Sequence, residues 1–190
     1  ALKDEVKERE IIEKELEEVI IEKDIATEAS LHDLLTGLPN RALFYDRLEH
    51  GLEQAQRHNW NLAVMFLDLD NFKQINDKYG HDIGDKILLS VAKKLKENTR
   101  SDDSICRLGG DEFLYLLMDV KNELEVTKII KKLIKKIELP YGNGDQKLVV
   151  KLSIGVSLFP KNAGNLEDLI KSADVAMYAA KKIKLGYAFA

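Results

Sequence analysis

The stretch Arg107-Leu108-Gly109-Gly110-Asp111-Glu112-Phe113 lies between two short apolar runs, residues 105–106 before it and residues 113–118 after it. Apolar runs that flank a Gly-Gly pair predict a β-hairpin, because glycine takes positive φ at both central turn positions without steric cost. Two carboxylates follow at once, at the start of the second strand. Such a tip suits a phosphate approaching the backbone and a divalent metal held beside it, whereas a surface hairpin with solvated acids is the alternative.

The composition describes one domain with an appendage. The chain has 190 residues, of which 45% are hydrophobic, enough for a sizeable core. A net charge of −4 argues against a surface for nucleic-acid polymers, so any phosphate binding is expected to be local. The single Cys106 excludes an internal disulfide and fits a reducing compartment. We expect a cytoplasmic location. Because the sequence begins with Ala1 rather than Met, membrane attachment is expected only through segments upstream.

Residues 1–30 contain no Gly or Pro and predict one continuous helix. Its apolar residues fit a heptad seam that Arg9 and Lys23 interrupt, which predicts a short parallel coiled coil between two chains; the alternative is a helix packed on its own domain. We place the domain boundary at about residue 30, so that 1–30 is a signalling helix and 31–190 a second domain. The seam consists of Leu2, Ile12, Leu16, Val19 and Ala26.

The remaining elements alternate in type. Asn40 is expected to cap a helix, residues 62–67 to form a strand buried on both faces, and a short helix to end at Gly80 before a loop and a longer helix over 83–98. A helix over 121–138, a turn at 141–145, a half-buried strand over 148–158 and a helix after Asn165 follow. This order predicts an α/β sandwich, a mixed and largely antiparallel sheet flanked by helices. In it, the end of the first strand and the hairpin tip lie side by side at one sheet edge.

The first predicted strand ends in Asp68-Leu69-Asp70, and acids there are costly to bury unless they are solvated or paired with a cation. Asp68, with Asp111 and Glu112 of the hairpin, can present oxygen ligands to one or two Mg²⁺ ions, as in phosphoryl or nucleotidyl transfer.

Lys73 lies five residues beyond Asp68, within reach of the same phosphates. Asn76 and Asp85 are suited to reading a base: a carboxylate accepts from two adjacent N–H groups of guanine, where adenine offers one donor, and an asparagine amide complements the guanine acceptors.

Six ordered segments between residues 30 and 183 resemble the GGDEF family of diguanylate cyclases. The resemblance implies a fold related to nucleotide cyclase and polymerase palm domains, and the condensation of two GTP into cyclic di-GMP and two pyrophosphates with Mg²⁺ or Mn²⁺. The segments are Asp33-x-Leu-Thr-Gly-Leu-x-Asn-Arg41, Phe66-x-Asp-x-Asp-x-Phe-Lys73, Asn76-Asp-x-x-Gly-His-x-x-Gly-Asp85, Arg107-x-Gly-Gly-Asp-Glu-Phe113, Ser153-Ile-Gly155 and Ala173-Asp-x-Ala-Met-Tyr178.

The resemblance also implies a role for each matching residue. Metal ligands are Asp68, the Leu69 carbonyl and Asp111, and Asp111 also accepts the proton of the attacking 3′-hydroxyl. The remaining roles are charge stabilisation by Lys73, substrate binding by Asn76, His81, Asp85, Gly109, Gly110 and Glu112, terminal-phosphate binding by Lys181, and inhibitory product binding by Arg100 and Asp103.

One segment departs from the family pattern. Where the family has Gly-Arg-Asn after the lysines, this chain has Ile183-Lys184-Leu185-Gly186, so a phosphate-binding arginine is replaced at best by Lys184, a point charge without the guanidinium fork. An active cyclase is the leading hypothesis. The alternatives are a weak or inactive regulatory domain that binds GTP or cyclic di-GMP, and a dimerisation module. Because the product joins two GTP molecules, an active cyclase is expected to be a symmetric homodimer.

Overall fold

The computed structural model describes residues 2–138, 140–141 and 148–190. Its five-stranded sheet has the order β2-β3-β1-β4-β5. Strand β1 pairs antiparallel with both β3 and β4, and only β5 is parallel to its neighbour β4. The sheet is therefore mixed and largely antiparallel, which confirms the predicted fold class. The strands are β1 (Leu62–Leu69), β2 (Ser104–Gly109), β3 (Glu112–Leu117), β4 (Leu152–Phe159) and β5 (Tyr187–Phe189).

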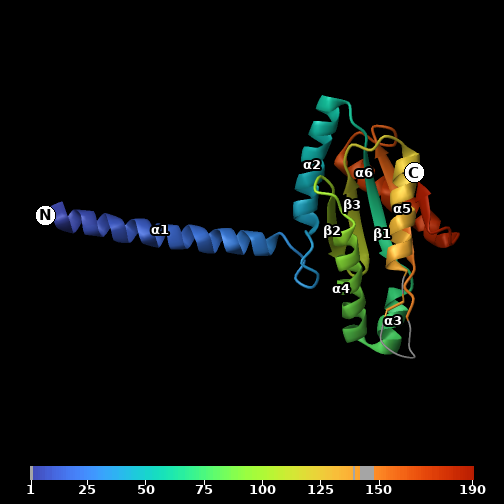
Figure 1. Ribbon diagram of the computed structural model, residues 1–190, viewed down its shortest axis with the longest axis horizontal. Coiled ribbons are helices and arrows are strands. Elements are labelled where there is room, and N and C mark those ends of the chain that lie inside the picture. The colour runs from blue at the N-terminus through green and yellow to red at the C-terminus, as the bar shows by residue number, and fades with distance from the viewer. Residues whose placement is uncertain (1, 139, 142–147) are drawn as a thin grey trace.

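Helices cover both faces of the sheet (Figure 1). Helices α2 (Arg41–His58) and α6 (Leu166–Lys182) pack on one face, and α4 (His81–Glu97) and α5 (Glu123–Ile137) pack on the other. Successive residues of β1 point into the two cores in turn: Val64 contributes to the α2–α6 side and Met65 to the α4–α5 side. All eight residues of β1 are buried, as predicted for a central strand. Helix α3 (Phe72–Tyr79) follows β1 at one end of the sheet.

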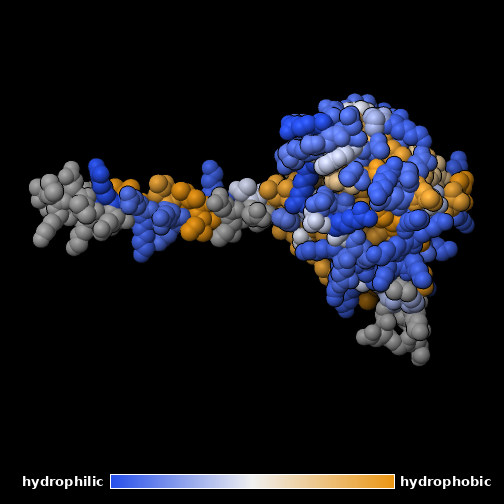
Figure 2. Space-filling model, turned by 45° about the horizontal axis from the view of Figure 1, so that its top comes forward, coloured by the Kyte–Doolittle hydropathy of each residue, from blue (hydrophilic) through white to orange (hydrophobic). Residues whose placement is uncertain are grey.

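Helix α1 (Leu2–Ser30) extends away from the globular part (Figure 1). Figure 2 shows apolar side chains along it, and Ile12, Leu16 and Val19 are each more than half exposed. The predicted seam is therefore on the surface where its side chains are described; the Leu2 side chain lies outside that part. The coiled coil and the division at residue 30 stay predictions. None of the described helices is long and apolar enough to cross a membrane.

Two boundaries differ from the predictions. Helix α4 begins at His81 without a preceding loop, because Gly80, at φ 87°, both ends α3 and precedes α4. Strand β4 covers only Leu152–Phe159 and is buried throughout rather than half-buried. The intervening positions in β4 are small residues that fit under α6: a Cβ at Gly155 would lie 1.9 Å from the carbonyl oxygen of Ala173. The turn predicted at 141–145 lies outside the described residues except for Tyr141.

Candidate active site

The hairpin tip and the end of β1 lie together, as predicted, although at one end of the sheet's middle strands rather than at its lateral edge. Asp68 is opposite Glu112 in the β1–β3 register, and the Leu69 N–H donates to the carbonyl oxygen of Asp111 at 3.2 Å. The two turn residues are Gly110 and Asp111. Gly109 belongs to β2, at a register shift with φ 143°, so the prediction of two glycines at the centre of the turn is corrected by one residue.

Carboxylates crowd this end of the sheet. Asp68 is only 7% exposed and pairs with Lys181 from the last turn of α6. Burial raises the pKa of Asp68, the Lys181 partner lowers it, and the charges of Asp111 and Asp70 raise it, so that the net shift is upward. The pKa of Glu112 is raised by burial and then by Asp68 and Asp111.

A simple ion pair would raise the pKa of the lysine and lower that of the carboxylate, whereas here the pKa values of both partners are raised. Burial lowers the pKa of Lys181, but its bond to Asp68 together with the charges of Asp68, Asp70 and Asp111 outweighs burial, so that the net shift is upward. The pKa of Asp68 rises as well, since one lysine does not offset burial and the neighbouring acids. The sheet end therefore carries an excess of negative charge that Lys181 compensates only in part, and a further cation is favoured there.

The donors available at this point fit Mg²⁺ or Mn²⁺. Asp68 and Asp111 offer carboxylate oxygens and Leu69 a main-chain carbonyl, which are the hard ligands that these ions prefer. Among the residues that the structure describes, no three His, Cys, Asp or Glu side chains form a ready-made metal site. A metal held here would thus rely on main-chain or substrate oxygens in addition to the carboxylates. Asp70 is turned to β4, where its Oδ1 accepts from the Ser153 hydroxyl at 2.8 Å.

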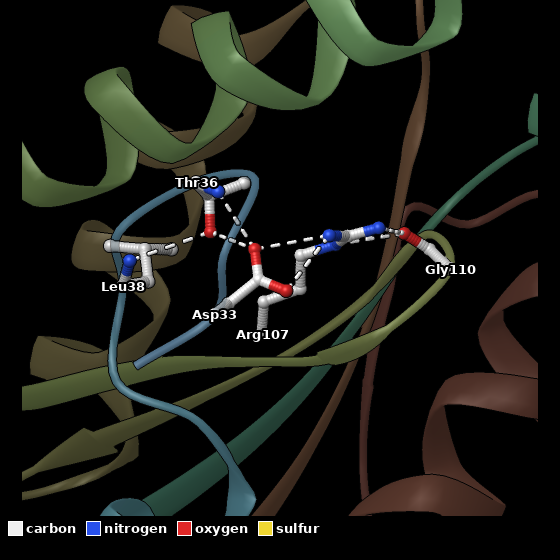
Figure 3. A network of polar contacts seen from close by, with 5 residues as sticks. All are labelled: Asp33, Thr36, Leu38, Arg107 and Gly110. Carbon is white, nitrogen blue, oxygen red and sulfur yellow. Dashed lines mark hydrogen bonds and ion pairs between the residues drawn. The ribbon is translucent and has the colours of Figure 1, made fainter. Parts of the chain in front are cut away.

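A polar network fixes the hairpin tip to the segment before α2 (Figure 3). Arg107 Nε and Nη2 donate to the Gly110 carbonyl oxygen at 3.0 and 2.8 Å, and Nη1 lies 3.0 Å from both carboxylate oxygens of Asp33. Asp33 also accepts from the Thr36 N–H and hydroxyl at 2.8 and 2.6 Å. Although burial raises the pKa of Asp33, the bonds from Thr36 and Arg107 outweigh it and leave the pKa below its usual value.

Sequence reasoning gave no role to this network, although both of its ends lie inside quoted motifs. Arg107 precedes the glycines and Asp33 opens the first motif, 74 residues earlier. An arginine beside a glycine turn is a signal for a contact to turn carbonyls, because these lack helix or sheet partners. The network holds the carbonyl of Gly110, the residue next to Asp111, and thereby the position of the Asp111 backbone.

The residues predicted to bind the base come from α3 and α4. Lys73 is exposed in the first turn of α3, and Asn76 is half-buried further along this helix. His81 and Asp85 are exposed and four residues apart in the first turns of α4, hence on one face of that helix. The structure brings the Asn76 side chain against Gly84, beside Asp85 in the chain.

A cavity of about 520 Å³ lies at the same end of the sheet, between the segment after β1 and the segment after α6. Three of its lining residues are lysines, Lys151, Lys181 and Lys184, and two are acids, Asp70 and Glu138. Lys184 adopts φ 55°, where a non-glycine residue is uncommon. The cavity therefore gathers positive charge beside the carboxylates. Sequence reasoning missed Lys151, whose position follows only from the pairing of β4 with β1.

Arg100 and Asp103 stand at either end of one turn, in which the Asp103 N–H donates to the Arg100 carbonyl oxygen at 3.2 Å. The Arg100 side chain is exposed and lies 3.6 Å from Glu125 of α5. Asp103 is only 8% exposed and accepts from the Met118 N–H at 3.0 Å; burial raises its pKa. The two side chains therefore differ in their nearest protein partners, although the charge and main chain of Arg100 also act to lower the pKa of Asp103.

Acidic side chains at the end of a central antiparallel strand, with a glycine turn and lysines next to them, are suited to handling nucleoside triphosphates. This fold and this site define the class, a catalytic domain of the nucleotide cyclase kind. The chain belongs to the GGDEF family: the family model described as "Diguanylate cyclase, GGDEF domain" matches residues 30–185.

Relatives agree with this assignment. The chain is 44% identical over 161 residues to MucR of Pseudomonas aeruginosa, named a bifunctional diguanylate cyclase/cyclic di-GMP phosphodiesterase, covering 84% of this chain and 23% of MucR. The GGDEF domain of TpbB from the same species has a solved structure that is 38% identical, with a TM-score of 0.77 over 83% of this chain and 91% of that one. The chain spans well under half the length of the curated relatives it matches.

A longer structural match includes the first helix. The coiled coil and GGDEF domain of DgcB from Caulobacter crescentus, solved in complex with c-di-GMP, superimposes with a TM-score of 0.83 over 93% of this chain and 94% of that one. The two sequences are 22% identical, so this likeness supports the fold alone.

Proposed function

We propose that this chain, as a homodimer, condenses two GTP molecules into cyclic di-GMP and releases two pyrophosphates. The observation that carries the proposal is the convergence of Asp68, Asp111 and Glu112 where β1 meets the hairpin, beside a turn whose glycines leave its backbone bare. Asp68, the Leu69 carbonyl and Asp111 would hold Mg²⁺ or Mn²⁺. When bound, the ion would make the attacking 3′-hydroxyl more acidic and neutralise charge on the phosphates.

The hairpin and α3 supply the groups nearest to the reaction. Asp111, at the turn, accepts the proton of the attacking 3′-hydroxyl, and Lys73 stabilises charge on the transferred phosphate. Gly109 and Gly110 let the phosphates approach the main chain, since neither carries a side chain that would meet them. Glu112 borders the same substrate and faces Asp68 across the two strands.

Base selection is assigned to the α3–α4 pair. Asp85 accepts from two adjacent N–H groups of guanine, Asn76 donates to a guanine acceptor, and His81 lies on the same exposed face of α4 as Asp85. Adenine presents only one donor where guanine presents two, so an adenine nucleotide would leave part of the Asp85 carboxylate unpaired.

The terminal phosphates of GTP belong in the lysine-lined cavity. Lys181 bridges this cavity and Asp68. Lys184 and Lys151 line it as well and supply charge where the family has an arginine. Because an ammonium lacks the arginine's fork, we expect a weaker grip on the phosphates than the family pattern would give.

A homodimer follows from the stoichiometry. One site binds one GTP, whereas the product needs a 3′-hydroxyl from each of two, so two hairpin tips must face each other across a two-fold axis. Helix α1 is suited to bring them together, because its apolar residues Ile12, Leu16 and Val19 are exposed and a short tether raises the local concentration to roughly millimolar. The proposed location is the cytoplasm, where GTP is available.

Product inhibition is proposed to act through Arg100 and Asp103. Arg100 is exposed and its pairing with Glu125 is loose, so its guanidinium is available to an incoming phosphate or guanine edge. Asp103 would have to exchange its bond to the Met118 N–H for a ligand.

A second candidate is a domain that binds GTP or cyclic di-GMP without turnover, favoured by the absence of the phosphate-binding arginine between residues 182 and 186. Incubating the purified protein with GTP and Mg²⁺ tests both. One cyclic di-GMP formed for every two pyrophosphates released, with no product from Asp111→Asn, supports the cyclase. Saturable GTP binding with no product at any protein concentration supports the regulatory domain instead.

A further inference from the structure

Helices α3 and α4 meet at a corner one residue long. The Gly80 N–H donates to the Asn76 carbonyl oxygen at 2.8 Å and ends α3, and the Gly84 N–H donates to the Gly80 carbonyl oxygen at 3.3 Å in the first turn of α4. The end of α3 is thereby folded against the start of α4. These are the two turns to which base selection is assigned, through Asn76 and Asp85.

Gly84 is where the two helices touch. It is buried, and a methyl group at this position would lie 1.8 Å from Asn76 Oδ1 and 2.9 Å from Asn76 Cγ, with Phe72 Cζ at 3.1 Å. The backbone of Gly84 is helical and outside the positive-φ region. Glycine is therefore required here for space rather than for its conformational freedom, because the Asn76 amide occupies the place of a side chain.

The oxygen end of the Asn76 amide is the end that meets Gly84. Its Oδ1 is buried and, within the described part of the chain, accepts no hydrogen bond. An oxygen that no donor holds is kept in place by packing, in this case against the bare Gly84 backbone. With the oxygen turned inward, the amide nitrogen and its two donors are left for a ligand.

We propose that Gly84 is a positioning residue for nucleotide binding, which seats the Asn76 amide so that its nitrogen faces the base. The identity of that base rests on the proposed function, in which Asn76 donates to a guanine acceptor. A side chain at residue 84 would displace the amide and weaken nucleotide binding without touching the nucleotide. Turnover of nucleotide that does bind would change less, because the carboxylates at the hairpin are not moved.

The test is Gly84→Ala in two backgrounds. In the natural background we expect a lower Tm and a GTP KM raised about three- to tenfold, the worth of one neutral hydrogen bond, with a smaller change in kcat. In the Asn76→Ala background the obstructing amide is gone and only Phe72 Cζ, at 3.1 Å, is close to the new methyl group. Alanine is also the better helix former, so Gly84→Ala should lower Tm less than in the natural background and leave KM unchanged.

Gly51→Ala is the matched control. Gly51 is also a buried helical glycine, but a methyl group there would meet the flexible Met118 side chain, 3.0 Å from its sulfur. It should leave the GTP KM unaltered. An equal KM penalty from Gly84→Ala in both backgrounds, or an equal loss of Tm in both, overturns the proposal.

Two further measurements separate a failure of this proposal from a folding defect and from a lack of cyclase activity. If Gly84→Ala does not fold but Gly84→Ala with Asn76→Ala does, Asn76 is shown to be the obstruction; failure of both variants to fold refutes this. The side-chain ¹⁵N–¹H signals of Asn76, assigned by their loss in Asn76→Ala, should shift in Gly84→Ala whether or not the protein turns over GTP. Unshifted signals would refute the positioning role even in an active cyclase.

Discussion

Replacing Asp33 with asparagine removes the charge opposite Arg107 while keeping an oxygen that can accept from Thr36. The Arg107 and Asp33 side chains are 11% and 18% exposed. Loss of one partner from a buried pair costs about 3–5 kcal/mol, because the other charge is left unpaired. With this residual exposure we expect Asp33→Asn to lower the free energy of unfolding by about 2–3 kcal/mol, or Tm by roughly 4–10 °C.

The pH dependence of this loss has a definite sign. The pKa of Asp33 is lowered in the folded protein, so its carboxylate stabilises the fold fully above the unfolded pKa of about 3.9, and this contribution is lost as pH falls through the lower folded pKa. A protonated Asp33 resembles asparagine. The stability difference between the natural protein and Asp33→Asn should therefore be constant above about pH 5 and shrink below about pH 4.

Urea unfolding at pH 7 and at a series of lower pH values measures this difference. Lys161→Gln serves as the control, since it breaks the ion pair between Lys161 and Glu123, whose side chains are 64% and 46% exposed, respectively. This variant should change the free energy of unfolding by less than about 0.5 kcal/mol. A difference for Asp33→Asn as small as that of the control, or one that persists unchanged to pH 3, would show that the network does not stabilise the fold through charge.

The network also predicts an effect on the hairpin tip. Once its carboxylate partner is gone, the Arg107 guanidinium is free to leave the Gly110 carbonyl that it now holds. We expect cyclase turnover by folded Asp33→Asn to drop by roughly tenfold or more, because a small displacement of a catalytic group has large kinetic consequences. Turnover should be measured at a temperature where circular dichroism shows both proteins fully folded.

Four further outcomes are expected. Asp111→Asn should reduce turnover more than about 100-fold without loss of secondary structure, and product formation near the natural rate would exclude its assigned role. Lys184→Ala should raise the GTP KM about three- to tenfold, whereas Lys182→Ala, which lies outside the cavity lining, should not. Removing residues 1–28 should lower specific activity at low micromolar protein, and activity independent of dilution in a monomer would disprove the dimer mechanism. Arg100→Ala should relieve product inhibition at unchanged initial velocity; inhibition that persists argues against this site.

Hydrophobic periodicity predicted most of the fold but misjudged β4. The pattern Leu-x-Ile-x-Val-x-Leu marks a half-buried strand when the intervening residues face water. Here these residues include Ser153 and Ser157, which are 1% and 0% exposed, and Gly155, which lies against the α6 backbone. Small residues under a closely packed helix and polar residues in solvent give the same alternating pattern in a sequence. Only the packing of α6 on the sheet distinguishes the two.

The site residues that could be predicted are those whose residue type and position in the chain indicate their chemistry. Asp68 and Asp111 stand out because a carboxylate at a strand end or at a glycine turn requires a cation or water. The contact between Arg107 and Asp33 could not be predicted, since both residues are common on surfaces and nothing in either segment indicates the other. Gly84 is a fixed position of a quoted motif, but nothing in the sequence indicates that it contacts Asn76. Metal binding and dimerisation stay predictions.

The central place of β1 has a consequence during synthesis of the chain on the ribosome. Its neighbours β3 and β4 are encoded later, and pairing with β4 is complete only at Phe159, about 90 residues after β1 ends. Because synthesis proceeds at about 5–20 residues per second, roughly 5–20 seconds pass before both partner strands of the eight-residue β1 have been made. In that interval α2 is the only one of the α2–α6 helix pair to have been made, and it alone can shield that face of β1 from other nascent chains.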